Sequence, residues 1–200
     1  MGHVILDITM SVDGFAAGPD VGRALPMGEG GERIHAWLGG GAGSETAVDR
    51  EVANEMFAST GAFVMGRRTF DLGEEPWGDD GTFGVPCFVV THRQREQLVK
   101  GPTTFTFVTD GVESAVDQAK AAAGDQDVVV MGGADIAQQS VRAGLLDEMR
   151  LHLAPVLLGA GTRLFDNLGS EHIELDRTSV IESPFATHLK FRVVGLSPPS

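Results

Sequence analysis

Two arginines and a threonine follow directly on a hydrophobic run that is typical of a buried strand. The segment FVMGRRTFD (63–71) ends its apolar part at Gly66 and continues with Arg67, Arg68 and Thr69. Guanidinium groups beside exposed helix N–H groups form a stronger anion site than either feature alone, because both are positive and donate hydrogen bonds. This junction predicts the binding of phosphate groups.

Two further hydrophobic runs end in polar or glycine residues. FVVTHRQ (88–94) ends in Thr91, His92 and Arg93, and VVVMGGADIAQQSV (128–141) passes through two glycines into an amphipathic segment. Those glycines have two interpretations: a tight turn that needs positive φ, or an open helix N-terminus that a phosphate can approach. Ligands of α/β sheets bind beyond the carboxyl ends of strands. Three such ends carrying three arginines therefore favour a polyphosphate ligand.

Asp49 is one candidate for handling a proton. It lies in the predicted helix 46–59, and its spacing from Val52 and Met56 turns it toward the interior. Partial burial there would raise its pKa and let it donate or orient a proton. The alternative is structural, because Thr46 followed by Asp49 is a helix-capping pair.

Other kinds of chemistry are not indicated. The six histidines contain no HxxxH or HxH pair, so no metal site is expected. Cys87 lies inside a strand and is expected to be part of the core rather than a nucleophile. We also expect Trp37 and Trp77 to pack in the core.

Helices and strands are predicted to alternate through the first part of the chain, and the last part is predicted to contain strands only. Strands are predicted at 3–10, 62–66, 86–90, 104–109 and 128–131, with helices at 46–59, at 110–124 (Asp110 as N-cap) and after the two glycines. EMRLHLA (148–154) alternates apolar and polar residues, as does the later pair HIELDRTSVI and ATHLKFRVV, which predicts an antiparallel hairpin with one wet face. The order predicts an α/β fold with a mixed sheet flanked by helices, as a single domain over 1–200.

Composition restricts the partners. The chain has 200 residues, 42% of them hydrophobic, which suffices for one sizeable core. A net charge of -13 argues against nucleic acid or an anionic membrane surface, both of which need a basic face. With one cysteine, no signal-peptide pattern and no long apolar run, we expect a cytoplasmic protein. The glycine-rich segment 39–44 is expected to be a surface loop and SPPS at the end a frayed tail.

The order and spacing of VMGRRTF, VVTHR and VVVMGGADIAQQSV resemble the dihydrofolate reductase fold. The opening SVDGFAAGPDVG and the later LHLAPVLLGAGTRLFDNL resemble a narrower branch, the reductase domain of the bifunctional riboflavin-biosynthesis deaminase–reductase and its stand-alone bacterial relatives. The resemblance extends from Ile5 to Val194. It implies a mixed, mostly parallel sheet, NADPH as hydride donor, a small-molecule substrate and a homodimer.

The resemblance also assigns residues. Gly66 to Thr69 would hold the adenosine 2′-phosphate and pyrophosphate side, and Thr91 to Arg93 would add to the 2′-phosphate pocket. The remaining implied cofactor contacts are Ala17, Met131, Gly132, Gly133, Ala134, Asp135 and Ile136. Asp49 lies close to where the dihydrofolate reductase pattern places its substrate-binding carboxylate. Asp13, in SVDGF, is the rival, because its family position faces the substrate side; its alternative is a turn-forming role.

The chain departs from the pattern in two respects. The deaminase half and its zinc-ligand cysteines are missing, so we expect no deamination. No clear D-P-x-L-x-x-R segment, which helps the riboflavin reductases hold the substrate phosphate, is found. The sequence thus predicts an NADPH-dependent reductase of a small pterin- or ribosylaminopyrimidine-like heterocycle, such as 5-amino-6-(5-phosphoribosylamino)uracil. The alternative is a non-catalytic nucleotide-binding protein that keeps the fold.

Overall fold

The computed structural model describes residues 2–39 and 45–197. The chain divides into two compact units, of which the first comprises the residues up to Leu6 with Ser59–Asp147, and the second Asp7–Ala58 with the residues from Glu148 onward. Most of the glycine-rich segment 39–44 and of the SPPS tail lies outside the described residues. Within the described ranges, no helix is long and apolar enough to cross a membrane.

The first unit is built on a mostly parallel sheet. Its strands follow the order β1-β7-β3-β4-β6-β5. All neighbouring strands are parallel except β5 and β6, which are antiparallel; β5 is the edge strand. The bounds are β1 (Val4–Ser11, of which Val4–Leu6 belong here), β3 (Thr60–Gly66), β4 (Cys87–Val90), β5 (Leu98–Lys100), β6 (Thr103–Val108) and β7 (Asp127–Gly132).

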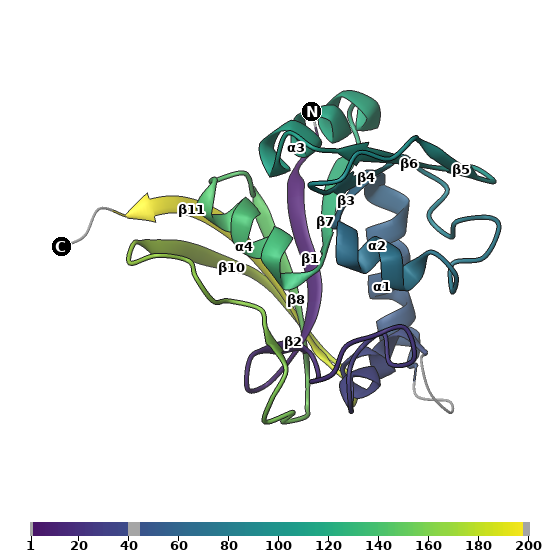
Figure 1. Cartoon of the computed structure of the whole chain (residues 1–200). Helices are drawn as coiled ribbons and strands as arrows, with labels where there is room; N and C mark the ends of the chain where they lie inside the picture. The colour runs from purple at the N-terminus through teal and green to yellow at the C-terminus, as the bar shows by residue number, and fades with distance from the viewer. Residues whose placement is uncertain (1, 40–44, 198–200) are drawn as a thin grey trace. The chain divides into compact units, whose positions relative to one another are not determined.

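Three helices follow strands of this sheet (Figure 1): α2 (Arg67–Gly73), α3 (Val112–Ala123) and α4 (Ala134–Arg142). The predicted helix after β6 is confirmed, and it ends at Gly124 as expected. Its predicted start is wrong by one residue, since the N-cap is Gly111 and not Asp110. Gly111 has φ 95°, a left-handed backbone that glycine adopts without steric cost, so the helix begins after it.

The core of the first unit is aromatic and β-branched. Phe70 of α2 packs edge-on against Phe105 of β6, with ring centroids 5.1 Å apart. Trp77 stacks parallel to Phe105 at 5.9 Å, so the expectation that this tryptophan belongs to the core is confirmed. Cys87 is fully buried in the same cluster, and burial raises the pKa of its thiol, which keeps the sulfur protonated and unreactive.

The second unit contains the predicted hairpin, whose long strands lie side by side in Figure 1. Strands follow the order β10-β11-β8-β1, with β10–β11 and β11–β8 antiparallel, and a separate pair β2–β9. The bounds are β2 (Phe15–Ala17), the 3-10 helix η1 (Gly31–Leu38), α1 (Ala47–Ser59), β8 (Glu148–Ala154), β9 (Thr162–Arg163), β10 (His172–Glu182) and β11 (Thr187–Ser197). The predicted class, a mixed and mostly parallel α/β sheet with flanking helices and a C-terminal hairpin, is confirmed.

The expectation of one wet face is met only in part. Arg192 is exposed on the polar face of the hairpin, but His188 on the same face is only 2% exposed, and on the neighbouring strand β8 His152 and Arg150 are 3% and 9% exposed. The reason is that other elements of the unit cover this face: Trp37 of η1 and Val52 of α1 form a buried cluster there, and η1 contacts β8. Alternation with a period of two shows which residues lie on the same face of a sheet, but not whether other elements bury that face.

Gly61 offers a test of how tightly helix α3 packs on β3. A Cβ at this position would lie 2.8 Å from the Cβ of Ala123 and 2.9 Å from its Cα. We therefore expect Gly61→Ala to lower the free energy of unfolding by roughly 1–3 kcal/mol, as overpacking does. Urea denaturation measures this. Gly22→Ala is the control, because its Cβ would meet nothing nearer than 3.9 Å; equal denaturation midpoints for the two variants would contradict the packing.

Candidate functional site

The ends of strands β3, β4 and β7 meet at one edge of the first unit's sheet. Gly66, the last residue of β3, lies opposite Val90 of β4, and Met65 lies opposite Gly132 of β7. Because these pairs are parallel, the residues that follow each strand leave the sheet at the same edge. The structure thus brings together the three predicted segments that begin at Gly66, Thr91 and Gly132.

The glycines at these ends have different reasons to be glycine. A Cβ on Gly66 would lie 2.9 Å from Cγ1 of Ile136, so Gly66 lets α4 pack closely on the end of β3. Gly132 has φ 139°, a backbone that residues with side chains rarely adopt. Gly133 has an ordinary extended backbone, and its Cβ would only touch the hydroxyl oxygen of Thr69 at 3.4 Å. The peptide bond between Gly132 and Gly133 is cis.

Helix α4 begins at this edge with an open N-terminus. Its N-cap is Gly133, which offers no side chain, so no side-chain hydrogen bond covers the first N–H groups. Those groups belong to Ala134, Asp135 and Ile136, and they carry the positive end of the helix dipole. The Asp135 carboxylate accepts a hydrogen bond from the Gln139 amide at 2.7 Å, within the helix itself. Met131, just before the glycines, is half-buried.

Cationic side chains surround the other two strand ends. Arg67 pairs with Asp71 at 2.7 Å, and its guanidinium carbon lies 5.6 Å from the centroid of the Phe107 ring. Arg68, His92 and Arg93 are exposed. Thr91 is buried, and its hydroxyl accepts a hydrogen bond from the Arg93 N–H at 3.1 Å, which shapes the turn after β4. The edge therefore combines backbone donors with positive charge.

Asp13, in the second unit, holds a loop. Its carboxylate accepts hydrogen bonds from the backbone N–H groups of Leu158 at 3.1 Å and Gly159 at 2.7 Å, and from the Ser11 hydroxyl at 2.6 Å. The Ser11 bond and these N–H groups lower the pKa of Asp13 to about 2. An ionised carboxylate held in this way anchors the 157–159 loop. Ala17, two strand residues after Phe15, pairs with Thr162 in the small β2–β9 sheet.

Asp49 points inward as predicted and also forms the predicted capping pair. Its side chain is fully buried. The Asp49 N–H donates to the Thr46 hydroxyl at 3.2 Å, while the Thr46 N–H donates to the Asp49 carboxylate at 3.0 Å, which is a reciprocal capping box. The predicted rise in pKa is wrong. Burial alone would raise the pKa of Asp49, but hydrogen bonds from Thr46, Ser183 and His188 outweigh it and lower the pKa.

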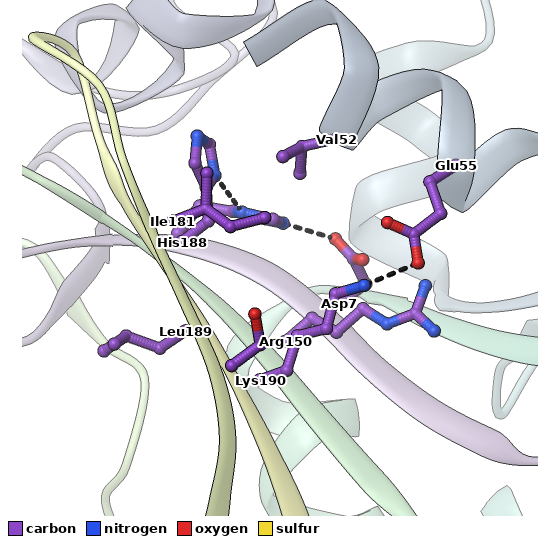
Figure 2. Close-up of a pocket in the computed structure, with 10 residues that line it drawn as sticks. Asp7, Val52, Glu55, Arg150, Ile181, His188, Leu189 and Lys190 are labelled. Carbon is purple, nitrogen blue, oxygen red and sulfur yellow. Dashed lines mark hydrogen bonds and ion pairs between the residues drawn. The ribbon is translucent and has the colours of Figure 1, made fainter. Parts of the chain in front are cut away.

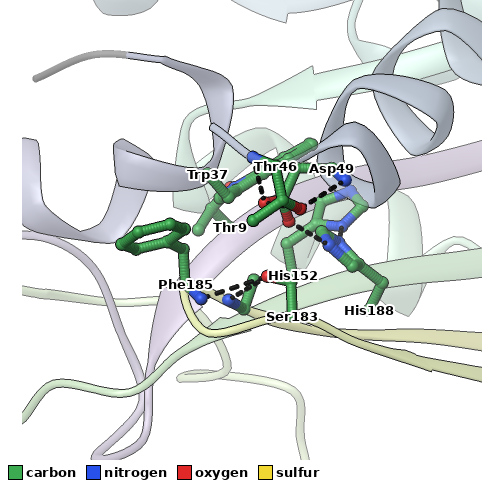
Figure 3. Close-up of polar contacts among 9 residues, drawn as sticks. Thr9, Trp37, Thr46, Asp49, His152, Ser183, Phe185 and His188 are labelled. Atoms are coloured by element: carbon green, nitrogen blue, oxygen red, sulfur yellow. Dashed lines mark hydrogen bonds and ion pairs between the residues drawn. The ribbon is translucent and has the colours of Figure 1, made fainter. Parts of the chain in front are cut away.

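Asp49 is one end of a buried polar chain through four side chains, of which Figure 3 shows Asp49, His188 and His152. Its Oδ1 lies 2.9 Å from Nε2 of His188, and Nδ1 of His188 lies 2.7 Å from Nδ1 of His152. Nε2 of His152 in turn lies 3.0 Å from Oδ1 of Asp7. Trp37 packs on both rings, at 4.2 Å from His152 and 5.0 Å from His188, and donates its indole N–H to Thr9. The expectation that Trp37 belongs to the core is confirmed.

The Asp7 end of this chain adjoins a small cavity (Figure 2). Asp7, His152 and His188 line it with residues from α1, β8, β10 and β11, namely Val52, Glu55, Arg150, Ser179, Ile181, Leu189 and Lys190. Its free space is close to that of a single water molecule. The second carboxylate oxygen of Asp7 is buried and has no hydrogen-bond partner among the described residues. A water molecule is the donor that would satisfy this oxygen.

Sequence analysis missed Asp7, His152 and His188. The two histidines are far apart in the chain, and only the β8–β11 register, which places His188 directly opposite His152, brings them together. The available signal was a histidine on the polar side of each alternating strand. No group of three potential ligands that could hold a metal ion occurs in the described part of the chain.

Comparison with known proteins bears on both units. The model of the RibD C-terminal domain matches residues 2–188. Uncharacterized protein YyaP of Bacillus subtilis (strain 168) is 23% identical over 171 residues, which are 82% of this chain and 80% of that protein.

Solved structures share the fold. A Shewanella sp. PV-4 protein assigned to riboflavin biosynthesis has a TM-score of 0.69 at 22% identity, covering 96% of this chain and 98% of its own. The Thermotoga maritima diaminohydroxyphosphoribosylaminopyrimidine deaminase/5-amino-6-(5-phosphoribosylamino)uracil reductase has a TM-score of 0.64 at 14% identity, covering 96% of this chain and 56% of its own. The fold is therefore dihydrofolate-reductase-like, as predicted. Because the family match extends over nearly the whole chain, the protein belongs to the RibD C-terminal domain family.

Proposed function

We propose that the protein is an NADPH-dependent reductase of a small heterocycle of the pterin or ribosylaminopyrimidine class. Family membership supports the reductase activity. The choice of cofactor rests on one observation: three strand ends meet at one edge of the sheet. The first N–H groups of α4 start at this edge without a side-chain cap, and Thr69 and three arginines (Arg67, Arg68 and Arg93) follow the neighbouring strand ends. A dinucleotide with a 2′-phosphate needs two features in its site: backbone N–H donors for the pyrophosphate and positively charged side chains for the 2′-phosphate.

The residues at this edge fit such a cofactor. The segment from Gly132 to Ile136 presents backbone N–H groups that no side chain caps, which suits a pyrophosphate. Arg68, His92 and Arg93 are exposed and carry side chains that can donate hydrogen bonds to a 2′-phosphate. Arg67 pairs with Asp71 through Nε, which holds its guanidinium group at this edge of the sheet. Ala17 and Met131 stay proposed cofactor contacts from the family resemblance.

The protein's own contribution to the reaction is positioning and the exclusion of water. When bound, NADPH would supply the hydride for a C=N or C=O carbon of the substrate. The chain would hold the two rings at contact distance. The lowered pKa values of Asp13 and Asp49 leave both carboxylates ionised at neutral pH. We therefore assign direct proton delivery to a water molecule. The active form is proposed to be a cytoplasmic homodimer.

The experiment that tests this function mixes the protein with NADPH and a panel of pterins and ribosylaminopyrimidines, and follows the loss of reduced-nicotinamide absorbance. Turnover of one class supports the proposal and names the substrate. Tight NADPH binding without turnover of any compound would instead favour the non-catalytic nucleotide-binding alternative. If NADPH does not bind, the proposal is wrong.

Cofactor preference is the first expected outcome. NADPH should bind at least tenfold more tightly than NADH, because charge-assisted contacts to the 2′-phosphate contribute about 1.5–3 kcal/mol each. The double substitution Arg68→Gln with Arg93→Gln should remove most of that preference and leave NADH affinity unchanged. Calorimetry at fixed salt measures both affinities. Arg177→Gln, which replaces an exposed arginine of β10, is the control; equal NADPH and NADH affinities in the unaltered protein would refute the prediction.

Substitutions at Gly133 and Gly132 distinguish a glycine needed for the approach of the cofactor from one needed for its backbone conformation. Its backbone is compatible with alanine, and a methyl group there would only touch Thr69, so Gly133→Ala should unfold at nearly the same temperature as the unaltered protein. The methyl group would nevertheless stand at the open N-terminus of α4 and should reduce the stabilisation that NADPH gives. Gly132→Val should instead destabilise the protein itself, because of φ 139°. Thermal melting with and without NADPH measures both effects, and an unchanged NADPH shift in Gly133→Ala counts against the pyrophosphate site.

A further inference from the structure

The Asp7–His152–His188–Asp49 chain has a proton count that its geometry dictates. Its three contacts, carboxylate to imidazole, imidazole to imidazole and imidazole to carboxylate, measure 3.0, 2.7 and 2.9 Å. Each joins atoms that carry lone pairs, so each is attractive only with a proton between them. Two bare Nδ1 atoms at 2.7 Å would repel each other. The chain therefore holds three protons.

Three protons exceed what neutral rings can supply. A neutral imidazole carries one N–H, so two neutral rings provide two of the three protons. The third must make one ring an imidazolium or one carboxyl a neutral acid. The carboxyl alternative fails at Asp49, because the hydrogen bonds from Thr46, Ser183 and His188 favour its ionised form and lower its pKa. At the Asp7–His152 contact the proton goes to the ring, because an imidazole is ordinarily a stronger base than a carboxylate. One imidazolium between two carboxylates is therefore the arrangement that remains.

The surroundings identify His188 as the neutral ring. Burial lowers the pKa of His188, and the hydrogen bond to Asp49 only partly opposes this. A neutral His188 that donates its Nε2–H to Asp49 has Nδ1 free to accept. His152 then donates from both nitrogens, to His188 through Nδ1 and to Asp7 through Nε2.

Charges on the neighbouring elements agree with a cation at His152. Of the basic side chains that line the adjoining cavity, Arg150 pairs with Glu148 at 2.5 Å, and Lys190 pairs with Glu55 at 2.6 Å. Among the described residues, the basic side chain that pairs with Asp7 is His152.

Two aromatic neighbours from η1 complete these surroundings. The Trp37 ring lies 4.2 Å from the His152 ring and 5.0 Å from the His188 ring, so His152 is the nearer of the two to the aromatic ring, which attracts a cation. Burial lowers the pKa of His35 to about 4, so this histidine is neutral.

We propose that His152 is a buried, structural imidazolium at neutral pH, and that its extra proton is the link that joins β1, β8, β11 and α1 in the second unit. The proton belongs to the folded state, because a carboxylate, an aromatic face and a neutral imidazole surround it only there. The proposal does not depend on the proposed catalytic function, since it concerns what holds Asp49 and the N-terminus of α1 against the hairpin.

This proton makes stability depend on pH in a definite direction. Histidine in an unfolded chain is neutral above a pKa of about 6.5, so folding above that pH takes up one proton. The stabilisation from the chain is fully present below that pH and is lost as the pH rises, until the folded protein also releases the proton. Within that window, one proton changes the unfolding equilibrium constant by a factor of ten per pH unit.

The protonation state can be observed directly in the unaltered protein. In protein labelled with nitrogen-15 in its histidines, side-chain nitrogen shifts at about pH 8 should show a doubly protonated ring at His152. The ring bonded to Asp49 should appear as the neutral Nε2–H tautomer. Single His→Gln substitutions assign the signals. Finding no imidazolium, or finding it on any ring other than His152, overturns the proposal.

Two isosteric variants separate the proton from ordinary packing. Asp7→Asn keeps an acceptor for the His152 N–H but removes the charge, so it should abolish the imidazolium signal at about pH 8 and flatten the fall of stability with rising pH. Glu55→Gln is the matched control, since Glu55 lines the same cavity but pairs with Lys190. It should leave the signal unchanged. An identical pH profile for Asp7→Asn and the unaltered protein contradicts the proposal even if both fold well.

Discussion

Parallel pairing of β3 with β4 on one side and β7 on the other is the constraint on which the proposed cofactor site depends. Parallel strands end at the same edge, so segments that are far apart in the sequence are placed together without any contact between their side chains. Helix α4 then starts at that edge, and its close approach to β3 is possible because Gly66 has no Cβ in the way of Ile136. Backbone donors and arginines meet there as a consequence of strand direction.

The second unit depends on a different kind of interaction, a cross-strand contact between two histidines. His152 and His188 are paired by the β8–β11 register, and each ring reaches a carboxylate on another element. Buried polar groups are costly when unpaired, so such a chain specifies one arrangement of its elements. It also explains why Asp49 does not behave as an isolated buried acid. Its hydrogen bonds favour the ionised form more strongly than burial disfavours it.

Glycine at a strand end has several physical origins, and the three junction glycines illustrate them. Gly66 allows helix packing, Gly132 allows a positive φ, and Gly133 needs neither. Gly133 is therefore the junction glycine at which the proposed pyrophosphate site can be tested with little change to packing or backbone geometry. The sequence offers two roles for these glycines, a turn or a phosphate site, but does not assign a role to each residue. The φ angles and packing distances that decide this are properties of the folded chain.

Local sequence patterns determined much of the architecture. Runs of β-branched residues indicated the central strands, the spacing of apolar residues indicated helix α3, and two successive alternating segments indicated the hairpin. The arginine and glycine junctions likewise indicated that three strand ends meet at one edge of the sheet. These features are predictable because they depend on neighbours within a turn or a strand. Tertiary structure decided the rest. A period of two shows that His188 and Lys190 share a face, but not that η1 and α1 cover that face at His188, nor that Asp7 and Asp49 close the chain at its two ends. Burial and hydrogen-bond partners are set by elements distant in sequence, and these turned an expected solvent-facing histidine and an expected proton donor into parts of one buried polar chain.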